Sequence, residues 1–167
     1  MEKKDIIKEA QFFMAEVKKI YKDSPYLLKR CARETSNLSF YKMFPRFAHK
    51  IANYGDQSYV YKIIASIYSV NPISYTEHES LGISCKRYQD IKKGAGSFEG
   101  KFLRFINSNN REYMFNSGNI LRLFKLLNRE SIPVNYENLF FDLWIWGERV
   151  KDNYACDYYS IGAKTLI

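Results

Sequence analysis

The sequence contains few of the side chains that metal sites, disulfide frameworks and catalytic triads require. Its 167 residues include only three cysteines and two histidines. Cys31, Cys85 and Cys156 are odd in number and far apart, so they suggest neither a disulfide framework nor a zinc half-site. We expect them to be small buried hydrophobes. With His49 and His78 as the only imidazoles, we expect no metal and no other cofactor.

Long apolar runs are lacking as well. No run approaches the roughly 18 residues of a membrane span. The N-terminal MEKKDIIKEA carries charges where a signal peptide has its apolar core. Hydrophobic residues make up 46% of the chain and charged residues 26%, which is typical of a folded globular protein rather than a disordered one. The sequence therefore predicts a soluble, cytoplasmic protein with no membrane partner.

The alternating pattern of β-strands is absent, and the spacing of apolar residues is helical nearly throughout. We predict a helical bundle over residues 1–70, with the largely apolar residues 59–68 at its centre. Residues 71–96 are polar and rich in turn formers, which predicts a linker with a possible short helix near 86–91. A second bundle is predicted over residues 97–167. The expected fold class is all-α, with two small helical bundles joined by a flexible linker.

The whole chain has a net charge of +8, and acidic residues are scarce in two parts of it. Residues 18–50 hold nine Lys and Arg against two Asp and Glu, and residues 86–129 hold ten against three. Residues 130–167 instead hold six acidic residues against three basic ones. A clustered basic field attracts polyanions, of which nucleic acid is the commonest. The alternative is a compositional bias that raises lysine everywhere, and the clustering argues against it.

The basic residues also collect on single faces of three predicted helices, at about 100° of turn per residue. Each basic face lies opposite an apolar stripe. The three groups are Lys29, Arg30 and Arg33; Lys101 and Arg104; and Arg122, Lys125 and Arg129. Almost no acidic residue separates them, whereas solvated helix faces usually mix both signs. Because no base-reading motif accompanies them, the pattern predicts binding to phosphates that is independent of sequence and weakened by salt.

Acidic residues gather in the last helical region, where they raise the possibility of catalysis. They are Glu137, Asp142, Glu148, Asp152 and Asp157. Clustered carboxylates can hold Mg²⁺ in a nuclease. Their spacing does not converge on one point of a helix, and no nucleophile–base pair accompanies them. We therefore expect no catalytic residue, with a metal-dependent nuclease and a free-standing all-α DNA-binding regulator as the competing functions.

Both tryptophans lie in one stretch, DLWIWGERV, at residues 142–150. We predict a single helix from Asn135 to about Tyr159. In that helix Trp146 joins one apolar stripe, which places it in the core. The stripe consists of Leu139, Leu143, Trp146, Val150 and Tyr154. Trp144 then points about 160° away, toward a second neighbour or a partner subunit. Arg149 lies off the stripe.

The order of motifs in the second half is recognisable as a whole. The motifs are Glu99-Gly100-Lys101-Phe102, Leu121-Arg122 to Leu126-Leu127, Pro133-Val134-Asn135-Tyr136, a Trp-containing helix, and Asp157-Tyr158-Tyr159. Gly82-Ile83-Ser84 and Leu28-Lys29-Arg30 extend the pattern toward the N-terminus. This order resembles the CasB family, the small subunit of the type I-E CRISPR Cascade surveillance complex. Gly100 and Glu148 depart from it, since charged and basic residues respectively are common there, and Glu148 puts the contribution of its face to DNA binding in doubt.

The resemblance implies an all-α subunit without enzymatic activity, present as two copies. It implies as partners the other Cascade subunits with their guide RNA, the target DNA, the displaced strand and a second copy of the chain. The nucleic-acid contacts that it implies are Lys29, Arg30, Lys101, Arg111, Arg122, Lys125 and Arg149. Arg33 and Arg104 are added from the helix faces alone. Because R-loop formation is nearly balanced in energy, modest contacts to the backbone can decide whether the loop persists.

Overall fold

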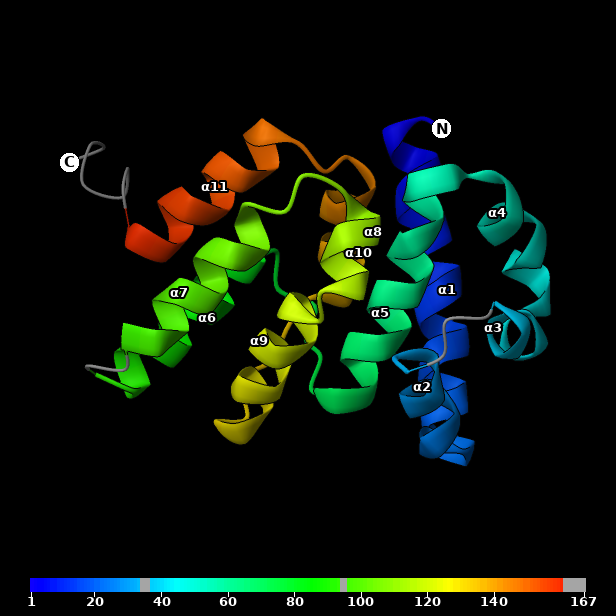
Figure 1. The fold of residues 1–167 in the computed structure, drawn as a ribbon, viewed down its shortest axis with the longest axis horizontal. Helices are drawn as coiled ribbons and strands as arrows, with labels where there is room; N and C mark the ends of the chain where they lie inside the picture. The colour runs from blue at the N-terminus through cyan, green and yellow to red at the C-terminus, as the bar shows by residue number, and fades with distance from the viewer. Residues whose placement is uncertain (34–36, 94–95, 161–167) are drawn as a thin grey trace.

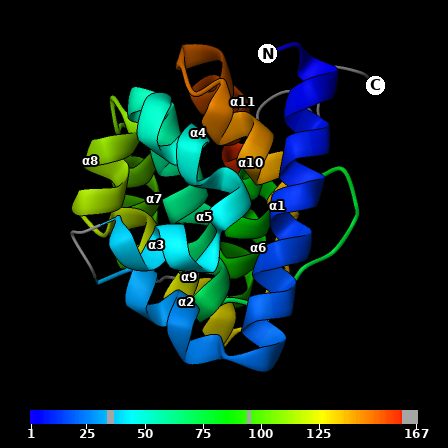
Figure 2. The same ribbon diagram turned by 90° about the vertical axis from the view of Figure 1, so that its right-hand side faces the viewer.

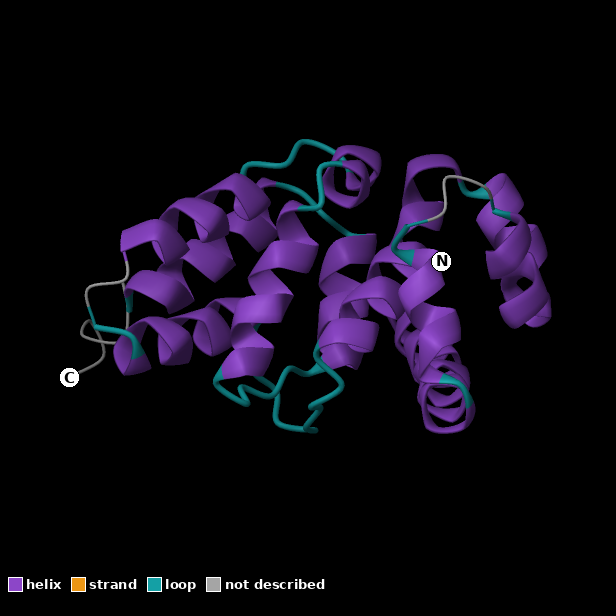
Figure 3. Cartoon of the chain, turned by 60° about the horizontal axis from the view of Figure 1, so that its bottom comes forward, coloured by secondary structure: helices purple, strands orange, loops and turns teal. Residues whose placement is uncertain are grey.

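The computed structural model describes residues 1–33, 37–93 and 96–160, and within these ranges the chain is helical apart from its connections (Figures 1 and 3). The elements are α1 (Lys3–Asp23), α2 (Pro25–Cys31), α3 (Leu38–Met43), the 3₁₀ turn η1 (Pro45–Phe47), α4 (Ala48–Asn53), the 3₁₀ turn η2 (Gly55–Ser58), α5 (Tyr59–Val70), α6 (Leu81–Ile91), α7 (Gly96–Ile106), α8 (Arg111–Asn116), α9 (Asn119–Arg129), α10 (Tyr136–Trp144) and α11 (Glu148–Tyr159). The described part contains one isolated β-bridge, between Ser74 and Val134, and no named strand. The all-α prediction is confirmed. None of the helices in these ranges is long and apolar enough to cross a membrane.

Helix α5 lies at the centre of the molecule. Nine of its twelve residues are buried, so it has apolar contacts on most sides, as its sequence predicts. It packs against α1 and α2 on one side and against α8, α9 and α10 on the other (Figure 1). Tyr61 shows this position most directly, because its ring meets Phe13 of α1, Phe140 of α10 and Trp144 edge-on, with centroids 5.0, 5.4 and 6.1 Å away.

The two halves of the sequence share one core. Helix α10 lies against α1 (Figure 2), and the rings of Phe13 and Phe140 are 6.0 Å apart. A single cluster of buried side chains runs from Ile6 to Tyr158. The predicted arrangement of two separate bundles is therefore not confirmed.

The segment predicted to be a flexible linker is held in place by hydrogen bonds to residues 132–135 and by the packing of α6. Val134 N–H donates to the carbonyl of Ile73 at 3.1 Å, and the Asn71 side chain donates to the carbonyl of Ile132 at 3.1 Å. The Asn135 side chain donates to the carbonyl of Glu77 at 2.8 Å. Beyond this stretch the predicted short helix is the full helix α6, which packs along α11. The flexible linker is thus not confirmed either, because its backbone is bonded to residues about 60 positions later.

The prediction of one helix from Asn135 to Tyr159 is wrong. The chain forms α10 and α11 with a turn at residues 145–147 between them. Trp146 sits in this turn and is buried as predicted, and its indole N–H donates to the carbonyl of Ser108 at 2.8 Å. Trp144 is also buried, at 5% exposure, with its ring edge-on to Tyr54 at 5.5 Å. Both tryptophans therefore belong to the core of this chain.

Candidate nucleic-acid interface

Four cationic side chains line one hollow on the surface. Helices α7 and α9 pack side by side, and residues of both helices, with Tyr88 of α6, line a hollow of about 490 Å³. Lys101 comes from α7, and Arg122, Lys125 and Arg129 come from α9. We call this hollow, with these four residues, the cationic groove.

The groove follows from the amphipathic sequences of its two helices. Helix α9 buries Ile120, Leu123, Phe124 and Leu127. Helix α7 buries Phe98, Phe102, Phe105 and Ile106. Because these residues point to the core, the opposite faces with their cations point to solvent, and Arg122, Lys125 and Arg129 are exposed. The predicted division of both helices into an apolar and a basic face is confirmed.

The aromatic rings that line the groove are buried and stacked on each other. The rings of Tyr88 and Phe98 stack at 4.2 Å, and the two residues are only 7% and 1% exposed. A nucleic-acid base has no free ring face there on which to stack. The groove therefore presents charge and hydrogen-bond donors rather than a stacking platform.

The charge of the groove is not neutralised from within. No ion pair joins any of its four cations to a carboxylate in the described ranges, and the Lys101 ammonium donates to the carbonyl of Ser97 at 3.3 Å. Nearby, Lys92 does pair with Glu130 at 2.8 Å. Four like charges in one hollow repel each other, and a bound polyanion relieves that repulsion.

Arg111 has a different place from the one expected of a surface contact. Its side chain is 12% exposed, and its guanidinium donates to Asp56 at 2.8 Å and to the carbonyls of Leu143 and Trp144 at 2.5 Å each. These are the last carbonyls of α10, and the Leu143 carbonyl also accepts from the backbone N–H of Trp146 at 3.4 Å. Burial alone raises the pKa of Asp56, but the bonds from Arg111 and from the backbone N–H groups of residues 111 and 112 outweigh it and lower that pKa. Arg111 thus ends α10 and ties it to η2 and α8.

The remaining predicted residues lie outside the groove. Arg104 is exposed on α7, and Arg149 is exposed on α11. Lys29 and Arg30 are exposed on α2, and Arg33 is exposed just beyond it. Figure 1 shows α2 and α7 on opposite sides of α5. The structure therefore brings together Lys101, Arg122 and Lys125 of the predicted set, and it does not bring the α2 cations to them.

The groove also contains a residue missing from the contacts that the resemblance implies. Arg129 lines it beside Lys125. The signal was present in the sequence, because Arg129 follows Lys125 by one helical turn on the same arc.

A comparison with protein-family models identifies the family. The model described as CRISPR-associated protein Cse2 matches residues 27–159. The chain belongs to the Cse2 family. Cse2 is the family also called CasB, so the chain is a subunit of the type I-E CRISPR Cascade. The Cse2 match includes the cationic groove, Arg149, and Lys29, Arg30 and Arg33, and it excludes α1. No curated protein and no solved structure matches the chain.

The acidic residues of the C-terminal part do not come together in this Cse2 chain as a metal-binding cluster. Within the described ranges, no three His, Cys, Asp or Glu side chains are placed to hold one metal ion. Asp142 is instead bonded by the Tyr154 hydroxyl at 2.7 Å. Burial, and more weakly the nearby charge of Asp157, raise the pKa of Asp142, and the Tyr154 bond opposes them.

Proposed function

We propose that this Cascade subunit is non-catalytic, binds the nucleic-acid backbone without sequence specificity, and stabilises the R-loop during antiviral defence. The observation that carries the proposal is the cationic groove, in which four cations share one hollow and form no ion pair with any carboxylate of the described residues. The Cse2 match favours this function over a free-standing DNA-binding regulator, because it makes the chain part of a complex in which a guide RNA reads the sequence.

The physical basis is neutralisation of phosphate charge. Each phosphate that a Lys or Arg neutralises releases condensed counterions, which makes binding favourable and steeply dependent on salt. Four cations correspond to a slope of roughly −3 to −4 in log K against log salt concentration. Because an R-loop and the duplex that it replaces are nearly equal in energy, contacts of this strength can hold the displaced or the target strand in place.

The buried aromatic rings of the groove support the absence of sequence preference. Tyr88 and Phe98 cannot stack on a base, and sequence-specific recognition needs contacts to base edges or ring faces. The groove therefore fits the phosphate backbone of any sequence.

The cations outside the groove are proposed as further backbone contacts on other parts of the path. These are Lys29, Arg30, Arg33, Arg104 and Arg149. We leave Arg111 out, because its guanidinium donors are used within the fold. A second copy of the chain, the guide RNA complex and the target DNA are the proposed partners, and the cytoplasm is the proposed location.

The test uses the assembled complex with Arg122→Glu and Lys125→Glu combined. We expect normal assembly, an R-loop lifetime shortened at least about tenfold, and a salt slope reduced by about two, one for each lost phosphate contact. The matched control is Lys4→Glu with Lys8→Glu, which makes the same charge change at exposed positions of α1. An unchanged R-loop lifetime and salt slope in a complex that assembles normally contradict the proposal.

The non-catalytic part has a separate test. Purified subunit is incubated with labelled DNA and Mg²⁺ or Mn²⁺, and we expect the DNA to remain intact. Cleavage that follows the subunit through purification contradicts this part of the proposal.

A further inference from the structure

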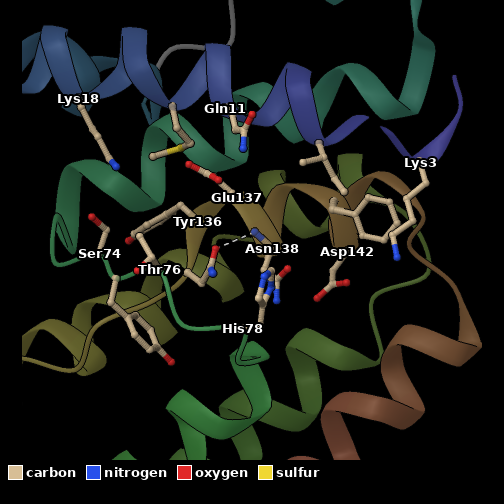
Figure 4. A pocket seen from close by; sticks show the side chains of 15 residues that line it. Lys3, Gln11, Lys18, Ser74, Thr76, His78, Tyr136, Glu137, Asn138 and Asp142 are labelled. Atoms are coloured by element: carbon tan, nitrogen blue, oxygen red, sulfur yellow. Dashed lines mark hydrogen bonds between the residues drawn. The ribbon is translucent and has the colours of Figure 1, made fainter. Parts of the chain in front are cut away.

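A second hollow differs from the cationic groove in both shape and chemistry. It has a volume of about 480 Å³ and lies between α1, the connection that follows α5, and α10 (Figure 4). Side chains of both charges and several amides and hydroxyls line it. Among them are Lys3 and Lys18 of α1, Ser74 and Thr76 of the connection, and Glu137 and Asp142 of α10. We call this hollow the α1–α10 groove.

One wall of the groove carries the isolated β-bridge, through Ser74. The backbone of the connection pairs in parallel with Val134, through the carbonyl of Ile73 and the N–H of Tyr75. In such a parallel pairing, the N–H and C=O of the residue between Ile73 and Tyr75 point away from Val134. That residue is Ser74, which lines the groove, and its N–H and C=O make no backbone hydrogen bond within the described ranges. A free N–H and C=O on one extended residue can donate to and accept from an added extended segment, as at the edge of a sheet.

The charges that line the groove are of both signs and are not paired with each other. None of Lys3, Lys18, Glu137 and Asp142 makes an ion pair in the described part of the chain. In Figure 4, Lys18 lies toward one end of the groove and Lys3 and Asp142 toward the other. A phosphate backbone is repelled by Glu137 and Asp142, so nucleic acid does not fit this groove. A polypeptide carries both signs and fits it.

The acidic end of the groove extends beyond Asp142. A neighbouring hollow of about 400 Å³ shares His78, Asn138 and Asp142 with the α1–α10 groove and adds Asp157. The end near α11 thus presents two carboxylates together with the ammonium group of Lys3, which leaves it net acidic, and the end at Lys18 presents an ammonium group. This arrangement suits a segment with a basic side chain at one end and an acidic side chain at the other.

We propose that the α1–α10 groove binds an extended segment of another protein subunit of the complex, which pairs with the free backbone N–H and C=O of Ser74. An acidic side chain of the segment faces Lys18, and a basic one faces Asp142 and Asp157. Helix α1 rises ~1.5 Å per residue, so Lys3 and Lys18 are about 22 Å apart. That distance corresponds to about six or seven extended residues.

The segment is assigned to another subunit because the described part of this chain offers no matching donor. Its one long non-helical connection, residues 71–80, is itself a wall of the groove. The proposal rests on membership of the complex, which the Cse2 match supplies, and it concerns assembly rather than DNA binding.

The test compares three variants of the full-length subunit. Lys18→Glu reverses the charge at one end of the groove, and Lys19→Glu is its matched control, since Lys19 is also exposed on α1 but does not line the groove. Ser74→Pro removes the free backbone donor and leaves both hydrogen bonds to Val134 possible, because these use Ile73 and Tyr75. Circular dichroism and thermal unfolding establish that each variant is folded.

The readout is the affinity of the subunit for a complex of the other subunits with guide RNA, without target DNA. We expect Lys18→Glu and Ser74→Pro each to weaken it about tenfold, which is the effect of one lost contact of ~1.4 kcal/mol, and Lys19→Glu to leave it unchanged. Wild-type affinity for both folded groove variants overturns the proposal. Normal affinity combined with weaker self-association of the subunit also overturns it, because the occupant is then a second copy. Failure of the DNA-binding proposal is seen in a different experiment, as an unchanged R-loop lifetime of the variant that combines Arg122→Glu and Lys125→Glu.

Discussion

The close packing of α6 on α11 predicts a large effect of the smallest possible substitution. A Cβ atom on Gly82 is 2.4 Å from the carbonyl oxygen of Tyr154 and 3.0 Å from the Cβ of Asp157. The first contact is with a helix backbone, which cannot turn aside as a long side chain can. Gly82→Ala must therefore push α6 away from α11, and overpacking of this kind costs about 1–3 kcal/mol. The gain in helix propensity, up to ~1 kcal/mol, offsets only part of this cost.

The assay is urea unfolding of the isolated subunit, with Gly100→Ala as the matched control. Gly100 lies in the interior of α7, and a Cβ there meets no atom within 4 Å. The same substitution should therefore raise the free energy of unfolding by about 0.5–1 kcal/mol at Gly100 and lower it at Gly82. Equal gains at both positions would refute the reasoning, because the contact with Tyr154 would then carry no cost.

Two further predictions concern partly buried charges. Arg111→Met should lower the free energy of unfolding by about 2–3 kcal/mol at pH 7, because it removes three hydrogen bonds and leaves Asp56 without its counter-charge. Since Arg111 lowers the pKa of Asp56, this loss should shrink as the pH falls through that lowered pKa, and a loss independent of pH contradicts the assignment. Asp142→Asn should instead raise the free energy of unfolding at pH 7. Burial, with the charge of Asp157 nearby, raises the pKa of Asp142 and disfavours its carboxylate, and the hydrogen bond from Tyr154 opposes this only in part. Because the folded pKa is raised, the gain should disappear in unfolding titrations below the ordinary pKa of aspartate, and equal stability of the two proteins at pH 7 argues against it.

The helix faces could be predicted from the sequence because amphipathicity is a local property. In α9, Leu123 and Leu127 repeat at the helical period and are buried, whereas Arg122 and Lys125 fall on the other side and are exposed. The same local rule finds Arg129. Prediction of the groove itself also requires knowing that α7 packs beside α9, which brings Lys101 next to Arg122 and Lys125. Periodicity does not contain that information.

Contacts between distant parts of the chain could not be read from local patterns. The polar, turn-rich segment after α5 has the composition of a linker, yet Asn71 and Ile73 are bonded to residues 132 and 134. Arg111 has the charge of a nucleic-acid contact, yet its donors are used by Asp56, 55 residues earlier, and by α10. In both cases the deciding partner is remote in sequence, and composition records only what a segment contains.

The stretch DLWIWGERV shows a second limit of periodicity. Leu143, Trp146 and Val150 are spaced as on one helix, and all three are buried, but the chain turns between α10 and α11. The turn is held by groups outside the stretch, with Ser108 accepting from the Trp146 indole and Arg111 bonded to the end of α10. The same burial pattern is therefore compatible with one helix and with two. The predicted position of Arg149 relative to the apolar stripe requires one continuous helix, whereas its direction in the structure is set by α11 alone. Its proposed DNA contact therefore rests on the family resemblance and not on the predicted stripe.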